Sequence, residues 1–329
     1  MPAAETGWRR GVAAAGDLSG CVAVDAMGGD HAPDAIVAGA VEAASSGTQV
    51  LLVGDTHAVE AALGGVAPHR RPGIVDAGET IDMTDPARTA LRLGDCSVRV
   101  AARLVAVGRA GAVLSAGSTG ASIVAARLEF GRLRGVRRPA VAAVIPAAES
   151  GSAAGHRGPR GDVVLVDAGA GAQGGAGVLR SNALMGMAYA RTRGVAHPRV
   201  GLLNIGAEPG KGHHGVQAAH RLLADLPGFV GNVEPAAVLA GAADVVVTDG
   251  FTGNLFLKTL EATLDPGSLY HGRSATSAAA VVGVAGTMLV AHGAADAPAI
   301  ADAVRSAAGL GPLRLHARVA EFLGMAPNR

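Results

Sequence analysis

The sequence predicts an α/β fold of three layers, in which helices cover both faces of a mostly parallel sheet. Short runs of Val, Ile and other apolar residues alternate along the chain with longer segments rich in Ala, Leu and Val. Strands that are apolar throughout are buried on both faces, as in the parallel sheets of α/β proteins. With 329 residues the chain can bury a substantial core. We expect residues 1–20 to be a disordered extension and 21–329 to form the α/β domain.

The expected elements follow from the apolar runs and the turn residues between them. Runs of four to six mostly apolar residues predict strands at 21–25, 50–53, 112–115, 140–145, 163–167, 199–204, 244–248 and 287–291. The longer segments between them predict helices at 34–46, 87–107, 121–130, 181–193, 216–223, 255–262 and 298–307. The Gly-rich stretch 150–161 is expected to be an exposed loop. Ligands of such sheets bind beyond the carboxyl ends of the strands, so the loops that follow strands are the places to look for a site.

Composition excludes several classes of protein. A net charge of +1 and an aromatic content of 2% argue against a nucleic-acid-binding protein. No apolar run approaches the roughly 18 residues needed to cross a bilayer. Two cysteines, Cys21 and Cys96, are too few for a disulfide framework and indicate a reducing cytoplasm. His213 and His214 lack the spacing of a zinc motif, so we expect no metal site.

The first expected strand ends in Asp25 and runs into Gly28, Gly29, Asp30 and His31. The two glycines permit a tight turn or the close approach of a ligand to the backbone. An ordinary strand–turn–helix junction is the alternative, but two acids and a His within one turn favour a site. His31 is a candidate to hydrogen-bond or protonate a leaving group.

A second strand end, at Ser115, is followed by small and hydroxyl residues that include Ser118, Thr119 and Gly120. Backbone N–H groups at the start of the next helix, together with the two hydroxyls, would form a cradle for an anion such as phosphate. Helix capping alone is the alternative explanation.

Lysine and asparagine are rare in this chain, and most of them follow strands. The only lysines are Lys211 and Lys258, and one of five asparagines, Asn204, comes shortly before Lys211. Lys211 lies between glycines and close to Glu208. A lysine so placed suits a phosphate or a developing oxyanion, so Lys211 is a candidate catalytic residue.

The richest segment holds two more asparagines and the second lysine. Its candidate residues are Asn232, Glu234, Asp249, Gly250, Thr252, Gly253, Asn254 and Lys258. We expect Gly250, Thr252 and Gly253 to help cradle phosphate, and Asn254 to stabilise charge. Asp249 is expected to orient its partners, while Lys258, four residues after Asn254 on the same helix face, could do either.

Residues 169–174 match the dinucleotide-binding pattern G-x-G-x-x-G after an expected strand. Glycine makes up 49 of the 329 residues, so about one such match arises by chance. The next strand ends in Asn204 where that pattern requires an acid. An NAD-dependent dehydrogenase therefore remains the weaker alternative.

Taken in order, these segments resemble the bacterial phosphate acyltransferases of the PlsX family. The resemblance covers about 21–308 and is carried by motifs at 24–33, 115–121, 138–140, 204–212, 231–234 and 244–258. It implies a fold similar to those of isocitrate dehydrogenases and phosphotransacetylases, a cytoplasmic homodimer, and no cofactor. It also implies transfer of a fatty acyl group from acyl-carrier protein to inorganic phosphate, giving the acyl phosphate used in phospholipid synthesis.

The chain departs from the family pattern at three places. Gly171 stands where the family usually has Asn, and Gly94 and Cys96 stand in place of Lys and Ser. The segment 262–280 is shorter than the helical arm of the family and is broken by Pro266, so we expect no membrane contact there. A catalytically degenerate homologue that binds acyl-carrier protein is therefore also an alternative.

Overall fold

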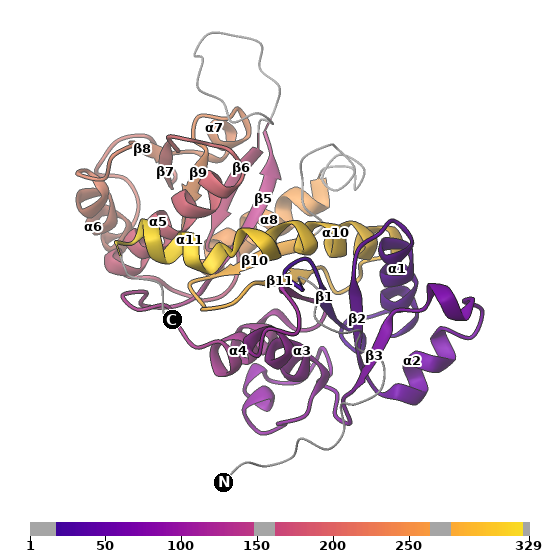
Figure 1. Ribbon diagram of the computed structural model, residues 1–329. Coiled ribbons are helices and arrows are strands. Elements are labelled where there is room, and N and C mark those ends of the chain that lie inside the picture. Colours follow the sequence, from indigo (N-terminus) through magenta and orange to yellow (C-terminus); the bar gives the residue numbers. More distant parts are fainter. Residues whose placement is uncertain (1–17, 148–161, 264–277, 325–329) are drawn as a thin grey trace. The chain divides into compact units, whose positions relative to one another are not determined.

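The structure is a computed structural model that describes residues 18–147, 162–263 and 278–324 (Figure 1). The chain forms two compact units. The first comprises Met1–Gly131 and Val284–Arg314, and the second comprises Arg132–Gly283 and Leu315–Arg329. Most of the expected extension 1–20 and the whole expected loop 150–161 lie outside the described residues.

The first unit contains a wholly parallel sheet in its described part. Its strands lie in the order β3 (Gly73–Asp76), β2 (Val50–Gly54), β1 (Val22–Asp25), β4 (Ala112–Ser115) and β11 (Met288–Ala291). The helices are α1 (Asp34–Ser45), α2 (Thr56–Ala62), α3 (Ser97–Ala106), α4 (Thr119–Glu129) and α10 (Ala297–Leu313), with short 3-10 turns η1 (Pro68–Arg70) and η2 (Ala87–Leu91). Helix α1 packs closely on α10, because a Cβ atom at Gly39 would lie only 2.7 Å from Cβ of Ile300.

The second unit contains a mixed sheet in which most neighbouring strands are parallel. The order is β10 (Ala278–Val282), β5 (Ala140–Pro146), β6 (Asp162–Val166), β9 (Val245–Val247), β7 (Val200–Leu203) and β8 (Phe229–Val233). Strand β5 runs antiparallel to both of its neighbours. The helices are α5 (Ala176–Thr192), α6 (His214–Leu223), α7 (Pro235–Leu239), α8 (Gly250–Thr263) and α11 (Leu315–Phe322). The predicted α/β class with a mostly parallel sheet is thus confirmed.

Several predicted helices differ from the structure in their bounds; α5 begins at Ala176 and α10 ends at Leu313, and two further differences have a visible cause. The single helix expected at 87–107 is instead η2 and α3, joined by an irregular loop around Gly94. The loop is held without helical hydrogen bonds, because Arg103 Nη2 donates a hydrogen bond of 2.8 Å to the carbonyl oxygen of Gly94. Helix α8 begins at Gly250, before the expected start at 255, because Asp249 Oδ1 caps it by accepting from the Thr252 N–H at 2.8 Å.

Candidate active site

The loops singled out by the sequence follow strands whose carboxyl ends are aligned. In the first unit Asp25 of β1 is opposite Ser115 of β4, and Val290 of β11 is also opposite Ser115. The segments after these strands therefore leave the sheet at one edge, which is the edge where parallel sheets bind their ligands.

Asp25 and Ser115 form the buried centre of this edge. The Ser115 hydroxyl donates to Asp25 Oδ2 at 2.7 Å and accepts from the Gly117 N–H at 3.1 Å. Asp25 is 3% exposed, and this burial raises the pKa of its carboxyl, while hydrogen bonds from Ser97 and Ser115 act in the opposite direction. The pair fixes the course of the chain after β4, and Asp25 lies too deep to meet a substrate itself.

Gly28 and Gly29 are required by the approach of one loop to another. A Cβ atom at Gly28 would lie 2.7 Å from Asp25 Oδ2 and 2.8 Å from the Gly117 nitrogen, and Gly29 has a φ of +118°. Asp30 and His31 follow with exposed side chains ahead of α1. The structure thus places His31 at the surface of this edge and gives the glycines a structural role.

The start of α4 shows capping as well as room for an anion. Ser118 is the N-cap residue, and its hydroxyl accepts from the Ala121 N–H at a distance of 3.5 Å, which is long for a hydrogen bond. Thr119 is partly exposed, and the first turn of the helix carries no acidic residue. Gly120 packs against Ala87, where a Cβ atom would lie 2.7 Å from the Ala87 Cβ. An anion at this helix start would meet N–H groups and hydroxyls, with no carboxylate from the first turn.

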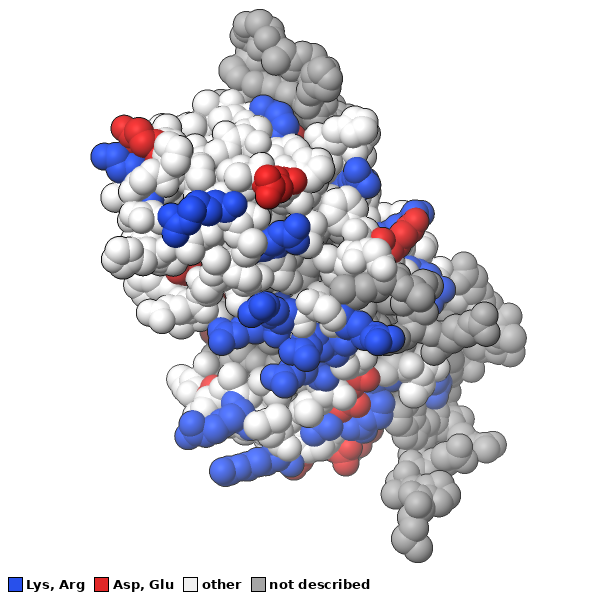
Figure 2. Space-filling model, turned by 90° about the vertical axis from the view of Figure 1, so that its left-hand side faces the viewer, with Lys and Arg blue, Asp and Glu red and all other residues white. Residues whose placement is uncertain are grey.

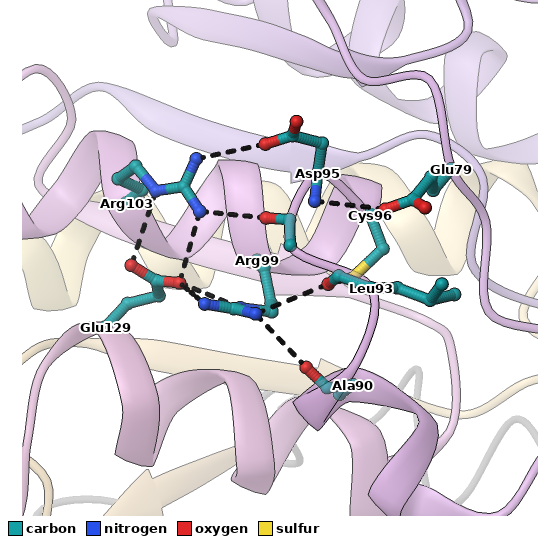
Figure 3. A network of polar contacts seen from close by, with 9 residues as sticks. Glu79, Ala90, Leu93, Asp95, Cys96, Arg99, Arg103 and Glu129 are labelled. Carbon is teal, nitrogen blue, oxygen red and sulfur yellow. Dashed lines mark hydrogen bonds and ion pairs between the residues drawn. The ribbon is translucent and has the colours of Figure 1, made fainter. Parts of the chain in front are cut away.

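The loop that carries Gly94 and Cys96 is held by a network of arginines (Figure 3). Arg99 Nη2 lies 2.7 Å from Glu129 Oε1, with both side chains less than one fifth exposed, and Arg103 also pairs with Glu129. Cys96 is buried, and burial raises the pKa of its thiol. A Cβ atom at Gly94 would meet nothing within 4 Å. Cys96 is therefore unsuited to act as a nucleophile, while position 94 has room for a side chain.

In the second unit, the glycine-rich loop after β6 is organised by Asp167. Its Oδ1 accepts from the N–H groups of Val141, Gly169 and Ala170 at 3.0, 3.0 and 2.8 Å, and its Oδ2 accepts from Gly171 at 2.9 Å. Burial raises the pKa of Asp167, and these four donors oppose that rise. The N–H groups that a dinucleotide phosphate would need are thus already bound to a carboxylate of the chain itself, which removes the main support for the dehydrogenase alternative.

The glycines at the start of α8 pack against this same loop. A Cβ atom at Gly250 would lie 2.8 Å from both Asp167 Oδ2 and the Gly171 nitrogen, and one at Gly253 would lie 2.8 Å from Cγ2 of Thr248. Close packing therefore requires glycine at both positions, whether or not phosphate binds there. Phosphate binding by this turn stays a prediction.

The side chains that α8 offers to a ligand are exposed. Thr252, Asn254 and Lys258 are all exposed, and Asn254 Oδ1 lies 3.6 Å from where a Cβ atom of Gly169 would be. Asn254 therefore lies beside the Asp167 loop. Asp249 accepts the Thr252 N–H, so its carboxylate already occupies part of the helix start.

The Lys211 loop is fastened by two buried asparagines. Asn204 Nδ2 donates to the carbonyl oxygen of Lys211 at 3.0 Å, and Asn232 Nδ2 donates to that of Glu208 at 2.7 Å. His220 Nδ1 lies 3.0 Å from Asn232 Oδ1, which is an acceptor, so this ring nitrogen carries a proton. The side chains of Lys211 and Glu208 remain exposed. The structure thus brings Asn204, Glu208, Lys211 and Asn232 together as a rigid loop that presents one lysine.

Sequence reasoning missed two residues that support the Lys211 loop and the end of β9 in the second unit. Gln217 Nε2 donates to the carbonyl oxygens of Gly210 and Gly212 at 2.8 and 2.9 Å. Asn182, 1% exposed on α5, donates to the Thr248 carbonyl oxygen at 3.4 Å. The rarity of asparagine was a usable signal for Asn182, whereas nothing in the sequence marks Gln217. Glu234, in contrast, is only the exposed N-cap residue of α7, and its side chain makes no capping hydrogen bond.

Comparisons with known proteins decide the family. A family model described as fatty acid synthesis protein matches residues 21–266. The phosphate acyltransferase of Heliobacterium modesticaldum is 40% identical over 320 residues, covering 87% of this chain and 92% of that protein. The chain therefore belongs to the family of phosphate acyltransferases. The phosphate acyltransferase of Nostoc punctiforme is 38% identical with 87% and 91% coverage.

Solved structures agree on the fold of this family member. A phosphotransacetylase from Streptococcus pyogenes matches with a TM-score of 0.64 at 14% identity, covering 89% of this chain and 94% of that one.

Within the described ranges no helix is long and apolar enough to cross a membrane. Nor do the described His, Cys, Asp and Glu residues form a group of three or more that could hold a metal ion. Most of the shortened segment 262–280 lies outside the described residues.

Proposed function

We propose that this chain transfers a fatty acyl group from the thioester of acyl-carrier protein to inorganic phosphate, giving an acyl phosphate for phospholipid synthesis. The observation that carries the proposal is the match to proteins named phosphate acyltransferase along 87% of the chain. A cytoplasmic location and a homodimer belong to the same proposal.

The proposed reaction is direct attack by phosphate. A phosphate oxygen forms a bond to the thioester carbon, a tetrahedral oxyanion forms, and the carbon–sulfur bond breaks to release the carrier thiolate. Phosphate is itself a nucleophile, so no enzyme nucleophile is needed. The buried cysteines fit this scheme, because burial raises the pKa of Cys21 to about 11 and also raises that of Cys96. The enzyme must orient phosphate and stabilise the oxyanion.

Phosphate fits the start of α4 better than the start of α8. Ser118 and Thr119 begin a helix whose first turn has no acid, whereas the carboxylate of Asp249 already caps α8. A dianion at α8 would meet that carboxylate in addition to N–H groups, which weakens the site electrostatically. We therefore assign the phosphate cradle to Ser118, Thr119 and Gly120 of the first unit. Phosphate binding by Gly250, Thr252 and Gly253 of the second unit stays a prediction.

The negative charge of the phosphate and of the oxyanion is stabilised by exposed side chains on loops that the fold holds in place. Lys211 stands on a loop whose backbone is bound by Asn204 and Asn232, so little ordering is required when an anion arrives. Asn254 can donate to the oxyanion, and Lys258 can serve either anion. His31, exposed at the same edge as Ser115, is the candidate to protonate the leaving sulfur.

The deciding experiment is incubation of the purified protein with acyl-carrier protein thioesters of several chain lengths, with and without phosphate, while free thiol is measured. We expect phosphate-dependent thiol release. In K211A the activation free energy should rise by about 2–4 kcal/mol, the range for loss of one oxyanion donor, so turnover should fall. Wild-type turnover in K211A would remove Lys211 from the mechanism. Carrier binding without any turnover would favour the degenerate homologue to which Gly94, Cys96 and Gly171 point.

A further inference from the structure

The second unit begins with a short loop that concentrates positive charge. The loop comprises residues 132–138, and we call it the arginine loop. Its exposed residues include Arg132, Arg134, Arg137 and Arg138, while Leu133 and Val136 between them are 5% and 2% exposed. The apolar side chains thus anchor the loop to the unit, and the guanidinium groups are left outside. Figure 2 shows one face of the molecule, on which several Lys and Arg side chains lie close together at the surface.

These arginines differ from the arginines that hold the fold together. Arg99, Arg193 and Arg199 each bind a carboxylate at 3.0 Å or less, namely Glu129, Asp162 and Asp244. Within the described residues no carboxylate pairs with any arginine of the arginine loop. Four exposed cations without anionic partners repel one another, so the arrangement costs stability unless an anionic partner binds them.

The arginine loop is also rigid and lies beside the candidate site. Arg132 Nη1 donates to the carbonyl oxygen of Arg137 at 2.9 Å, and Arg138 Nη1 donates to that of Gln173 at 3.2 Å. Gln173 follows the Asp167 nest directly in the chain, and Asp167 in turn binds Val141 at the start of β5. A partner held by these arginines is therefore adjacent to the carboxyl edge of β6.

The chemistry of the loop selects the kind of partner. Its apolar residues point inward, so it offers nothing to insert between lipid chains. The whole chain has a net charge of only +1, so it lacks the broad positive field of a nucleic-acid-binding protein. A compact set of exposed arginines, two of which are held by hydrogen bonds to the backbone, matches the carboxylates on the surface of an acidic protein, which guanidinium groups bind with two parallel hydrogen bonds.

We propose that the arginine loop is the docking surface for an acidic protein that carries the acyl thioester. The inference rests on the proposed function and adds the place where the protein part of the substrate binds. Charge pairs at the rim of an interface act mainly on the association rate and on its dependence on salt. The arginine loop should therefore control KM for a protein-bound thioester and leave the chemical step unchanged.

The experiment compares one acyl group on two carriers, acyl-carrier protein and free pantetheine. The test variant is R134E/R137E, which leaves Arg138 and its contact with Gln173 in place. The matched control is R70E/R71E in the first unit, which makes the same change in net charge at two exposed arginines. Arg70 Nη2 donates to the Ser45 hydroxyl and Arg71 Nε to the Val66 carbonyl oxygen, and neither arginine pairs with a carboxylate among the described residues. Far-UV circular dichroism and thermal unfolding check that both variants fold.

We expect R134E/R137E to raise KM for the carrier-protein thioester about tenfold at low salt, with the effect shrinking as salt is added. Turnover of acyl-pantetheine should equal that of wild type, and R70E/R71E should change neither substrate. Equal KM values for the carrier-protein thioester in the two double variants would overturn the inference. So would binding of anionic vesicles that R134E/R137E alone abolishes while its carrier-protein KM stays normal. No turnover of either thioester by wild type would instead show that the proposed function is wrong.

Discussion

Replacing Asp167 by Asn removes one charge and one acceptor from a buried nest of four N–H donors. All four hydrogen-bond partners of Asp167 donate to it, and the side chain is 5% exposed, so we take the carboxylate as charged at neutral pH despite its burial. Asparagine can keep one oxygen over Val141, Gly169 and Ala170. Its amide nitrogen must then face the Gly171 N–H, which donated to Oδ2 at 2.9 Å in the native protein.

The loss of stability in D167N follows from the contact between the amide nitrogen and the Gly171 N–H. One charge-assisted hydrogen bond is lost, and a part-buried donor is left facing another donor, which together lower the free energy of unfolding by about 2–4 kcal/mol. Urea unfolding at pH 7 measures this change. D249N is the matched control: Asp249 accepts one N–H at a helix start, and Asn caps helices about as well as Asp, so its effect should be near zero. A D167N protein within about 0.5 kcal/mol of wild type would refute the account of this loop.

Three further changes test other parts of the structure. G28A should lower the free energy of unfolding by about 1–3 kcal/mol, because its Cβ atom would lie 2.8 Å from the Gly117 nitrogen. G65A is the control, because its Cβ atom would meet nothing within 4 Å, and thermal unfolding should show no change. N232A should speed amide hydrogen exchange across residues 205–212 and lower turnover, because it removes the hydrogen bond to the Glu208 carbonyl oxygen. Unchanged hydrogen exchange in these residues would contradict the conclusion that Asn232 holds the Lys211 loop. Neither Cys21 nor Cys96 should react with a thiol reagent at pH 8 until the protein is denatured, because both are buried with raised pKa values.

The sequence predicted eight of the eleven described strands, because apolar runs carry their own signal, and it missed β3, β8 and β10. The runs at 50–53 and 112–115 are buried strands in the structure, and their carboxyl ends lie at one edge as expected. Strand direction was harder, because the run at 140–145 reads the same whether its strand is parallel or antiparallel. The helix expected at 87–107 failed for another reason: tertiary contacts from Arg99 and Arg103 stabilise a loop that local propensity alone disfavours.

The candidate site shows the same division between local and tertiary information. Rarity drew attention to Asn204 and Asn232, but their part in holding the Lys211 loop depends on chain segments that meet only in the fold. At residues 169–174 the glycines suggested a dinucleotide-binding loop. The structure shows that the informative residue is the Asp before them, since it consumes the N–H groups that the glycine pattern seemed to offer.

Gly171 allows a direct test of the departures from the family pattern. A Cβ atom there would lie 3.7 Å from Asp167 Oδ2 and 3.9 Å from Arg138 Nη1, which are ordinary contact distances, and its backbone N–H would still bind Asp167. G171N should therefore unfold within about 0.5 kcal/mol of wild type, since the added Cβ atom fits without a shift of its neighbours.

The same variant shows whether the missing amide limits the chemistry. An asparagine at 171 would add a hydrogen-bond donor next to the Asp167 nest, in the loop beside Asn254, to which the proposed function gives stabilisation of the oxyanion. We expect G171N to raise turnover of the carrier-protein thioester severalfold, and G65N, the same change at an open surface glycine, to leave it unchanged. A stable G171N protein with wild-type turnover would mean that glycine at this position is fully compatible with the reaction. The next position to test would then be Gly94, where an added Cβ atom would meet nothing within 4 Å.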